Sequence, residues 1–518
     1  MTDHIPVLII ALPLLTAFIL PIVGMIDTRL RNILVFAVIA AVNLMLFSLI
    51  QRVSIGGEVL HYVVGAADPL QVIREGLDFP IRIVLKIDGF SLFMALISGV
   101  ITFVVFLFSL SYIKEGERKN YYQLLMLLIF VGMLGMEFTN DLFNFFVFLE
   151  ILSIASAALV AYRTDRKHPP YAGYKYMLVS AIATSFLLMG IALCYAQYGS
   201  FNIDYIHDMM KYTLLDKMAL VFMLVPLAMK AGAIPMHMWV PDTYSEAPAP
   251  ISALLKTASM ASLYGLFRLS FSLFGNPLEG AGMNYHTLGW IIIVMGVLSM
   301  FVGVTMALVQ NDVKRLMAYH AVSQTGYMLL GVGVGIAVHA QADGGSAFKL
   351  FGRVAMMGGI FHMMNHAFYK GLLFLTSGVM ARRFGTRDLN RMVGLAHRDT
   401  FTTVAFVIGA LAIAGIPPLN GFSSKILLYE SVYQFSPLLS IIAIFVSVLT
   451  LASFMKVFYS AFMGPERKDM IVDATPVSKG MILGMSILCV LVVGFGLFPD
   501  LVVGTIVEPA IESLVTIL

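Results

Sequence analysis

Several ionisable residues lie inside long apolar runs, where a charge is costly. Glu150 lies in FFVFLEILS, and Lys230, Lys256 and Lys425 lie deep within other expected membrane spans. A charged side chain at the bilayer centre costs about 2.5–3.5 kcal/mol on insertion scales. Lysine suits proton transfer because a buried ammonium group can lose its proton, whereas an arginine guanidinium does not. Each residue is therefore a candidate for proton transfer, with a paired structural role as the alternative.

Glu150 and Lys230 are candidates for a functional pair. An ion pair between them would reduce the cost of burying both charges. Such a pair would also respond to a proton or to another nearby charge, because opposite charges favour ionisation while desolvation opposes it. The alternative is an inert salt bridge that only holds two helices together.

A second candidate group is a stripe of titratable residues. His362, His366 and Lys370 are four residues apart, which places them on one face of a helix. Such stripes can hold water and pass protons. The segment HMMNH superficially resembles the zinc-binding HExxH helix, but it lacks the glutamate, so no metal site is predicted.

Three other polar residues leave two interpretations open. His237, in PMHMW, either bridges the lysines at 230 and 256 or is a buried histidine with its own hydrogen-bond partners. Lys175 and Arg268 lie near the edges of apolar runs. Either residue could serve in transport or could extend to a lipid headgroup.

The composition indicates an all-α, polytopic membrane protein. Of the 518 residues, 59% are hydrophobic and 12% are charged, and the mean hydropathy is +0.89. Soluble domains are about half apolar and a quarter charged. Apolar runs of about 20 residues, the length that a helix needs to cross a bilayer, recur throughout the chain. Because these runs are continuous rather than alternating, they exclude a transmembrane β-barrel.

The apolar runs predict about 14 transmembrane helices. Residues 51–87 are expected to form one long polar loop, and residues 500–518 a short apolar tail at the membrane interface. The expected helices are 5–24, 31–50, 88–112, 121–139, 142–161, 172–196, 218–242, 249–274, 288–310, 316–338, 350–380, 402–434, 437–462 and 477–498.

The distribution of lysine and arginine among the loops predicts how the chain is oriented in the membrane. Most of the lysine and arginine residues outside the expected helices lie in loops that follow odd-numbered helices. Examples are RTDRK (163–167), NDVKR (311–315) and ARRFGTRDLNR (381–391). The positive-inside rule then places these loops in the cytoplasm and both termini outside. The N-terminal segment lacks a basic n-region, so it is interpreted as the first spanning helix rather than a cleaved signal. The absence of a visible transit peptide favours a prokaryotic cell membrane.

Two expected helices, the seventh and the twelfth, are interrupted by glycine and proline. The interruptions are GAIP (232–235) and GIPP (415–418). Proline removes a backbone donor and clashes with the preceding turn, and the freed carbonyl groups then need partners or a water-lined cavity. The odd spacing of five helices predicts two inverted repeats, helices 4–8 and helices 9–13, around an ion path. Kinks that serve only packing are the alternative.

The repeats predict a division of the chain into four parts. Residues 1–112 hold three N-terminal helices and the long loop, and residues 113–274 form the first five-helix repeat. Residues 288–463 form the second repeat, and residues 464–518 form a C-terminal helix and tail.

Nothing in the sequence predicts a cofactor or a catalytic redox site. Cys194 and Cys489 lie in apolar segments, and no CxxC motif occurs, so this chain alone is not expected to build an iron–sulfur or zinc site. GVGVG (331–335) lies inside an apolar helix and is not a phosphate-binding loop. The net charge of +3 gives no indication of nucleic acid as a partner.

Four long motifs resemble the antiporter-like subunit family. They are LAMKAGAIPMHMWVPDTYSEAPAPISALLK (227–256), NDVKRLMAYHAVSQTGYML (311–329), NHAFYKGLLFLTSG (365–378) and GIPPLNGFSSK (415–425). This family comprises the L-, M- and N-type membrane-arm subunits of respiratory complex I, the A- and D-type subunits of Mrp antiporters, and H-type subunits of membrane-bound hydrogenases. The resemblance covers about residues 88–465.

The resemblance implies fourteen helices with two inverted repeats, and it implies roles for individual residues. It matches Glu150 and Lys230 to the family's first ion pair and Lys256 to its central lysine. It matches the stripe of His362, His366 and Lys370 on the eleventh expected helix to the family's histidine and lysine stripe. Lys425 matches the family's terminal lysine. Lysine at both the central and the terminal position is closest to the D-type Mrp subunit and its hydrogenase counterparts. His320 departs from the family, where a small hydroxyl residue is common; it starts an expected helix and is expected only to cap a polar surface.

Together these features favour an ion-translocating subunit of a larger membrane complex. Protons would enter near Glu150 and Lys230, pass Lys256 and the histidine stripe, and leave past Lys425. The partners would be other membrane subunits, with a peripheral iron–sulfur or hydrogenase-like redox module as the driving unit. The alternatives are a D-type subunit of an Mrp sodium/proton antiporter, a self-sufficient antiporter, and a structural anchor. Sodium also stays open, because carboxylates and carbonyl groups at a broken helix can bind it.

Overall fold

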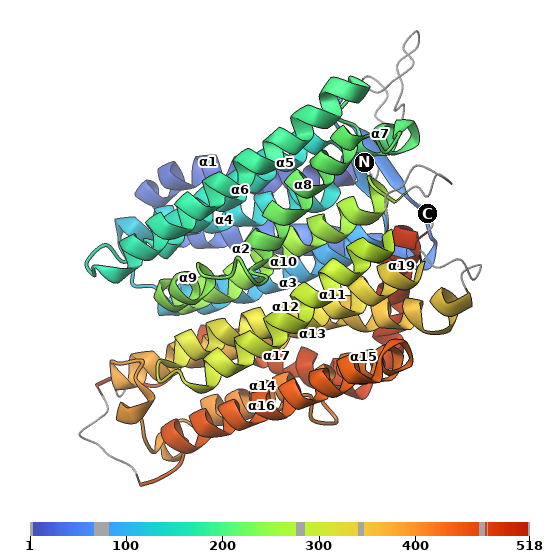
Figure 1. Cartoon of the computed structure of the whole chain (residues 1–518). Helices are drawn as coiled ribbons and strands as arrows, with labels where there is room; N and C mark the ends of the chain where they lie inside the picture. The colour runs from blue at the N-terminus through green and yellow to red at the C-terminus, as the bar shows by residue number, and fades with distance from the viewer. Residues whose placement is uncertain are drawn as a thin grey trace.

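The chain forms a bundle of long helices that run side by side along one axis (Figure 1). The computed structural model describes residues 4–66, 82–275, 285–339, 346–465, 472–473 and 475–515. Within these ranges, ten helices are long and apolar enough to cross a membrane. The predicted all-α, multi-pass fold is thereby confirmed, while the exact number of fourteen spans stays a prediction.

The helices follow the predicted order, and two of the predicted spans are each formed by two shorter helices. The first half contains α1 (Ile5–Ile26), α2 (Thr28–Leu49), the π-helical turn η2 (Ile50–Ile55), β1 (Leu60–Val63), β2 (Val84–Ile87), α3 (Gly89–Tyr112), α4 (Glu117–Phe138), α5 (Leu142–Val160), α6 (His168–Tyr198), α7 (Ile203–Met209), α8 (Leu214–Ala231), α9 (Val240–Glu246) and α10 (Ala249–Ser272). The second half contains α11 (Tyr285–Leu308), α12 (Val313–His339), η3 (Phe348–Gly352), α13 (Arg353–Phe384), η4 (Leu389–Arg391), η5 (Leu395–His397), α14 (Thr400–Ala414), α15 (Asn420–Phe435), α16 (Pro437–Ala461), α17 (Lys479–Leu497), α18 (Pro499–Val502), η7 (Val503–Val507) and α19 (Glu508–Val515).

The predicted polar loop 51–87 is more ordered than expected. Its described part contains an antiparallel hairpin in which Leu60 of β1 pairs with Ile87 of β2; residues 67–81 lie outside the described residues. The short helix α7 was also not predicted, because seven residues are too few to show a helical period. We call the end of the bundle that carries the hairpin and α7 the hairpin face, and the opposite end, with the loops at 163–167, 311–315 and 381–391, the basic face.

Three helices form the centre of the bundle. Every residue of α10 is buried, and α12 and α13 are buried over nearly their whole length. By contrast, α6 and α16 leave large apolar side chains exposed along one side. A helix enclosed by other helices can carry polar side chains that find partners within the protein. The central helices therefore provide the interior in which ionisable residues can lie.

The first predicted break ends α8. Gly232 adopts a φ of +80°, and its N–H donates to the Met229 carbonyl at 3.1 Å. The next N–H, of Ala233, donates to the Ala228 carbonyl at 3.0 Å. This left-handed glycine ends the helix because a side chain is strongly disfavoured at that φ. The chain becomes helical again at α9.

The second predicted break repeats this geometry at the end of α14. Gly415 also has a φ of +80°, and its N–H donates to the Ala412 carbonyl at 3.0 Å. The N–H of Ile416 donates to the Leu411 carbonyl, again at 3.0 Å. Both broken helices are therefore confirmed, and their breaks share one hydrogen-bond pattern.

A second repeated feature supports the inverted arrangement. Before α5, Leu142 N–H donates to the Phe201 carbonyl at 2.8 Å and Ile203 N–H donates to the Asn140 carbonyl at 3.0 Å. This short bridge lies at the hairpin face, beside α7.

The equivalent bridge lies at the basic face. Before α12, Val313 N–H donates to the Arg387 carbonyl at 3.0 Å and Leu389 N–H donates to the Asn311 carbonyl at 2.9 Å. The two bridges have the same pattern at opposite ends of the bundle, as two inverted repeats require.

The C-terminal tail packs on the bundle at the hairpin face. Ile511 and Leu514 of α19 are fully buried. The Ser513 hydroxyl accepts a hydrogen bond of 2.9 Å from the backbone N–H of Phe90 in the first turn of α3. The tail was expected at the membrane interface; its described part, up to residue 515, covers the start of α3, and both chain ends lie on this side of Figure 1.

Candidate functional site

The predicted ionisable residues lie on five helices and one break. Apart from Glu150 and His237, which are partly exposed, these side chains are buried. Their positions are Glu150 on α5, Lys230 in the last turn of α8, His237 between α8 and α9, Lys256 on α10, His362, His366 and Lys370 on α13, and Lys425 on α15.

Lys230 is held by hydroxyl groups rather than by a carboxylate. Its Nζ donates to Ser180 Oγ of α6 at 2.6 Å and also to Ser153 Oγ of α5. Glu150 lies one turn away on α5 and is near enough to act electrostatically on Lys230. Among the described residues, however, no ion pair joins Glu150 to Lys230, so the direct pair expected from the sequence is not formed in this structure.

Lys256 lies at the centre of the bundle. Its Nζ donates to Thr325 Oγ1 of α12 at 2.8 Å. The Thr325 hydroxyl in turn donates to the Ala321 carbonyl at 2.9 Å. A hydroxyl that accepts from an ammonium and donates to a carbonyl can support the lysine in its charged form. The central lysine therefore connects α10 to α12.

His362 is the centre of a polar cluster formed by α12, α13 and α15. Its Nδ1 lies 2.9 Å from Ser424 Oγ, and its Nε2 lies 3.1 Å from Gln324 Oε1. The Tyr369 hydroxyl lies 3.2 Å from the same Nε2 and 3.3 Å from Gln324 Oε1. Gln324, Ser424 and Tyr369 were not predicted, although a glutamine within the apolar run AVSQTGY was a signal that could have identified the first.

His366 and Lys370 continue the stripe on α13. The ring of His366 lies 6.3 Å from that of His362. Within the described part of the chain, neither ring nitrogen of His366 nor Nζ of Lys370 has a hydrogen-bond partner. Lys370 instead lies over aromatic rings, 5.4 Å from the centroid of Phe374 and 6.0 Å from that of Phe454. Such cation–π contacts partly replace water around a buried ammonium.

His320 does not cap a polar surface, contrary to the expectation. It is fully buried, its Nε2 contacts the Ser453 hydroxyl, and its ring lies 4.7 Å from that of Phe454. The reason is that α12 runs through the centre of the bundle, so its first turns are enclosed. His320 and Lys370 thus share one aromatic neighbour, Phe454.

Lys425 lies at the second helix break. Its Nζ donates to the Ile413 carbonyl at 2.8 Å and to Ser447 Oγ at 2.7 Å. It also lies 4.7 Å over the ring of Tyr327. The Ile413 carbonyl is one of the terminal groups of α14 that the break leaves without an intrahelical partner. A lysine satisfies this carbonyl and complements the negative end of the helix dipole.

His237 lies in the first break and, within the described ranges, bridges no lysine. Its Nδ1 is buried and, among the described residues, has no hydrogen-bond partner. Trp239 nearby donates from Nε1 to the Met229 carbonyl at 2.9 Å and so satisfies a terminal carbonyl of α8. His237 is therefore placed beside the break without a direct contact to Lys230 or Lys256.

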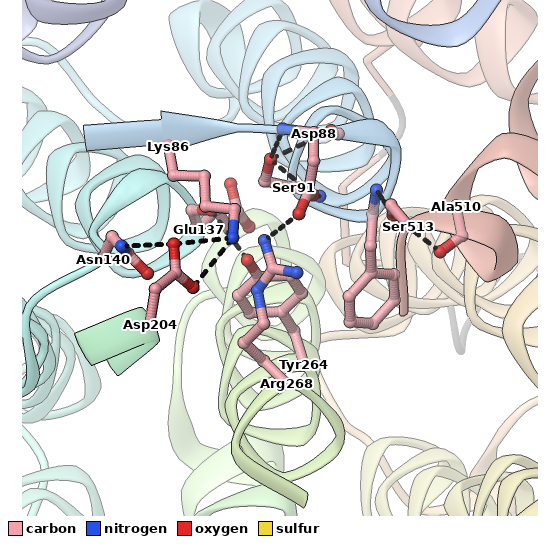
Figure 2. A network of polar contacts seen from close by, with 11 residues as sticks. Lys86, Asp88, Ser91, Glu137, Asn140, Asp204, Tyr264, Arg268, Ala510 and Ser513 are labelled. Carbon is pink, nitrogen blue, oxygen red and sulfur yellow. Dashed lines mark hydrogen bonds and ion pairs between the residues drawn. The ribbon is translucent and has the colours of Figure 1, made fainter. Parts of the chain in front are cut away.

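The two residues at the edges of the spans both form ion pairs. Lys175 Nζ lies 2.6 Å from Asp242 Oδ2, and Arg268 Nη2 lies 2.5 Å from Asp88 Oδ2. Arg268 is buried, so it does not extend to a headgroup. It belongs to a polar network at the hairpin face that also contains Glu137 (Figure 2). Glu137 was not among the predicted site residues, because it lies within one turn of the end of its expected helix, 121–139.

A cavity of about 1110 Å³ opens on the basic face. Its positively charged lining residues are Lys114, Arg118, Arg163, Arg166, Lys314, Arg382 and Arg387, and its acidic ones are Glu115, Asp165, Glu246 and Asp473. Lys314 is buried, and its Nζ donates to the Ala247 carbonyl at the joint between α9 and α10. The described residues contain no group of three or more histidine, cysteine, aspartate or glutamate side chains that could hold a metal ion.

Inverted repeats, paired broken helices and a row of buried ionisable groups define a helical membrane protein of the transporter type. Comparison of the sequence with known families agrees. The chain belongs to the antiporter-like subunit family: the family described as "NADH:quinone oxidoreductase/Mrp antiporter, TM" matches residues 139–450. A second family, "NADH-Ubiquinone oxidoreductase (complex I), chain 5 N-terminus", matches residues 75–123.

Two similar proteins come from the Na(+)/H(+) antiporter of Alkalihalophilus pseudofirmus. Its A-type subunit is 32% identical over 82% of this chain and 54% of its own length. Its D-type subunit is 32% identical over 75% of this chain and 75% of its own length. The chain thus spans about half of the A-type relative but three quarters of the D-type relative.

Two solved complexes contain chains with similar structures. A chain of the Mrp complex from Dietzia sp. has a TM-score of 0.85 and 26% identity over 99% of this chain and 97% of its own length. A chain of the membrane-bound sulfane sulfur reductase, an archaeal respiratory membrane complex, has a TM-score of 0.83 and 25% identity, over 99% of this chain and 98% of its own. Both are subunits of multisubunit membrane complexes, and this chain is an antiporter-like subunit of that type.

Proposed function

We propose that this chain translocates protons through its interior as one subunit of a multisubunit membrane complex. The observation that carries the proposal is the row of buried ammonium groups at Lys230, Lys256, Lys370 and Lys425. In the described part of the chain, none of them has a carboxylate at ion-pair distance; their partners are hydroxyl groups, a carbonyl and aromatic rings. A purely structural lysine would be expected to have a permanent carboxylate partner.

The roles follow the order of the residues across the bundle. Protons enter near Glu150 and Lys230, with His237 assisting at the first break. They pass Lys256, then His362, His366 and Lys370, and leave past Lys425. Polar groups between these residues, such as Thr325 and Gln324, can order water between them. Movement of one proton changes the electrostatic environment of the next lysine, which couples the steps.

The broken helices would provide the flexible points of this path. Lys230 lies in the last turn of α8, and Lys425 contacts the last turn of α14. We infer the division 1–112, 113–274, 288–463 and 464–518, with one break in each repeat. A change at either break would therefore move one lysine relative to the central row.

The driving force would come from a partner. The leading proposal is a redox module of iron–sulfur or hydrogenase-like type, as the similarity to a chain of an archaeal respiratory membrane complex suggests. The second is an Mrp sodium/proton antiporter without a redox partner, which the names of the similar A- and D-type subunits favour. In that case sodium would be the exchanged ion.

We also propose a prokaryotic cell membrane with both termini outside. The basic loops and the cationic cavity lie together on the basic face, and the termini lie at the opposite end. The positive-inside rule assigns such a face to the cytoplasm. The cavity would then face the cytoplasmic supply of protons.

Transport by variants of the complete complex tests the proposal. Lys230→Ala and Glu150→Gln are expected to abolish coupled transport while the complex still assembles. Undiminished transport in both variants would overturn it. Mass spectrometry of the native complex, purified through a tag on this chain, decides between the drivers. An iron–sulfur protein in the preparation would support the redox pump, and small membrane subunits alone would support the antiporter.

A further inference from the structure

A carboxyl group that the proposed path does not use lies deep in the first repeat. Glu137, on α4, has no solvent exposure. Its Oε1 accepts a hydrogen bond of 2.6 Å from Ser98 Oγ of α3, and its Oε2 has no partner among the described residues. An isolated buried carboxylate is very costly, and such groups usually neutralise by taking up a proton. A neutral carboxyl group needs fewer partners than an ionised one.

The backbone of Glu137 is linked to a buried ion pair. The Tyr264 hydroxyl of α10 donates to the Glu137 carbonyl oxygen at 2.8 Å. One turn further along α10, the guanidinium of Arg268 lies 5.8 Å from the Tyr264 ring and pairs with Asp88 at 2.5 Å. The Tyr264 hydroxyl is within electrostatic reach of Arg268, Asp88 and Glu137. Arg268 Nη1 is buried and has no hydrogen-bond partner in the described part of the chain.

A second ion pair extends the network to the surface. Lys86 of β2 contacts both carboxylate oxygens of Asp204 on α7, at 2.8 and 2.9 Å, and Asn140 donates to the same carboxylate at 3.0 Å. The side chain of Asp204 is 37% exposed, whereas that of Asp88 is 2% exposed. His61 of β1 pairs with Lys86 across the hairpin. Figure 2 shows Glu137, Tyr264, Arg268, Asp88, Lys86 and Asp204 as one cluster beneath the hairpin strand β2.

We propose that Glu137 is a second proton-binding site of this protein, in exchange with water at the hairpin face along this network. The carboxyl group holds one proton on its free oxygen, and releasing it leaves a carboxylate that keeps the Ser98 hydrogen bond. The proton goes to water, with Asp88 and Asp204 as the groups that can accept it in passing. Arg268 pairs with Asp88 and Lys86 pairs with Asp204, and both cations attract the charge of the ionised Glu137.

The geometry distinguishes this site from a structural hydrogen bond. A purely structural glutamate between α3 and α4 would be expected to use both oxygens, because an unpaired buried acceptor is unfavourable. A cation site would need several oxygen ligands; among the described residues, only the Ser98 hydroxyl is hydrogen-bonded to the carboxyl group. A proton needs only the free oxygen and a route to solvent.

Infrared difference spectroscopy of the complete complex in lipid, between high and low pH, tests the inference. We expect a protonated-carboxyl band that disappears in Glu137→Gln, an isosteric change that mimics the neutral form and should preserve folding. Glu58→Gln is the matched control, because Glu58 is an exposed partner of Arg52 at the same face. The band should remain in this control. If the Glu137→Gln complex shows the same protonated-carboxyl bands as the wild-type complex, the proposal is overturned.

Two further measurements test the exchange route and protect against a variant that does not fold. Ser98→Ala removes the one hydrogen bond to the carboxyl group and should shift its band; an unshifted band would contradict the assignment. Asp88→Asn should slow hydrogen–deuterium exchange of the Glu137 band, and unchanged exchange would exclude the route.

The inference rests on the proposed proton transport, but the two can fail separately. Transport that survives Lys230→Ala would overturn the proposed function, while the Glu137 band would still report whether this carboxyl group binds a proton. If transport is lost in Lys230→Ala but unaffected in Glu137→Gln, the proposed function stands and only a role of Glu137 in transport is overturned.

Discussion

Lys425 of α15 donates a hydrogen bond of 2.8 Å to the carbonyl oxygen of Ile413, near the end of α14. The two residues lie on opposite sides of the same helix break. The contact therefore links the terminal lysine of the proposed path to the backbone of the interruption. A change in the charge of this lysine would act directly on the end of α14, because the ammonium complements its dipole.

Lys425→Met should lower both stability and transport. The variant leaves the Ile413 carbonyl buried without its donor, which costs about 1–3 kcal/mol. Thermal unfolding of the complex and proton transport in vesicles measure the two effects. Lys425→Arg is the control, since arginine keeps a donor and a charge but does not release its proton. We expect it to restore stability more than transport, and full transport by the arginine variant would contradict proton release from Lys425.

Ser153→Ala and Ser180→Ala should together impair transport more than either change alone. The two hydroxyls are the hydrogen-bond partners of the Lys230 ammonium, so removing both leaves a buried charge with little support. Rates of coupled transport for the two single variants and the double variant form the test. Wild-type rates in the double variant would mean that these hydroxyls do not hold Lys230 in the working protein.

Gln324→Leu should reduce transport by disrupting the cluster around His362. The change removes the oxygen that lies 3.1 Å from Nε2 of the histidine. Thr376→Val is a matched control on α13, because among the described residues the Thr376 hydroxyl bonds only to the Leu373 carbonyl of its own helix. Transport by reconstituted complexes should fall in the first variant and stay unchanged in the second. An equal loss of transport in both variants would indicate a general loss of packing rather than disruption of the His362 cluster.

Gly232→Ala and Gly415→Ala should each destabilise the protein. Both glycines have a φ of +80°, and the left-handed region costs an L-residue about 1–2 kcal/mol. An added Cβ would also lie 2.7 Å from Val240 Cγ2 at the first site and 2.9 Å from Lys425 Cδ at the second. Gly494→Ala within α17 is the control, since its Cβ would lie more than 4 Å from the neighbouring atoms of the described residues. The melting temperature should be lower for Gly232→Ala and Gly415→Ala than for Gly494→Ala.

The contact between Lys86 and Asp204 should depend on pH. Burial raises the pKa of Asp204, but the charge and hydrogen bonds of Lys86 outweigh it, so the pKa lies below its ordinary value. Because the folded pKa is lowered, the stabilisation is complete above the unfolded pKa of about 4 and is lost as pH falls through the folded value. Proteolysis of the hairpin face should therefore accelerate only in strong acid. Asp204→Asn should remove this acid sensitivity, and an unchanged pH profile would contradict the assignment.

Much of the fold was predictable from contiguous stretches of sequence. Apolar runs gave the spanning helices, because helix length and hydropathy are local properties. GAIP and GIPP located both breaks, since in each a left-handed glycine ends the helix and is followed by a proline that cannot continue it. The hairpin and α7 were missed because their four- and seven-residue elements are too short to show a period.

From the sequence alone, Lys230, Lys256 and Lys425 could be assigned to the interior because they lie within expected membrane spans, whereas the buried Glu137 and His320 were not recognised. The hydrogen-bond partners of the interior residues depend on how the helices pack. Lys230 meets serines of α5 and α6 rather than Glu150, and His362 meets α12 and α15. These contacts depend on how each helix is rotated about its axis against neighbours that are distant in the sequence. The periodicity of a sequence shows which residues share one face of a helix. It does not show which other helix packs against that face.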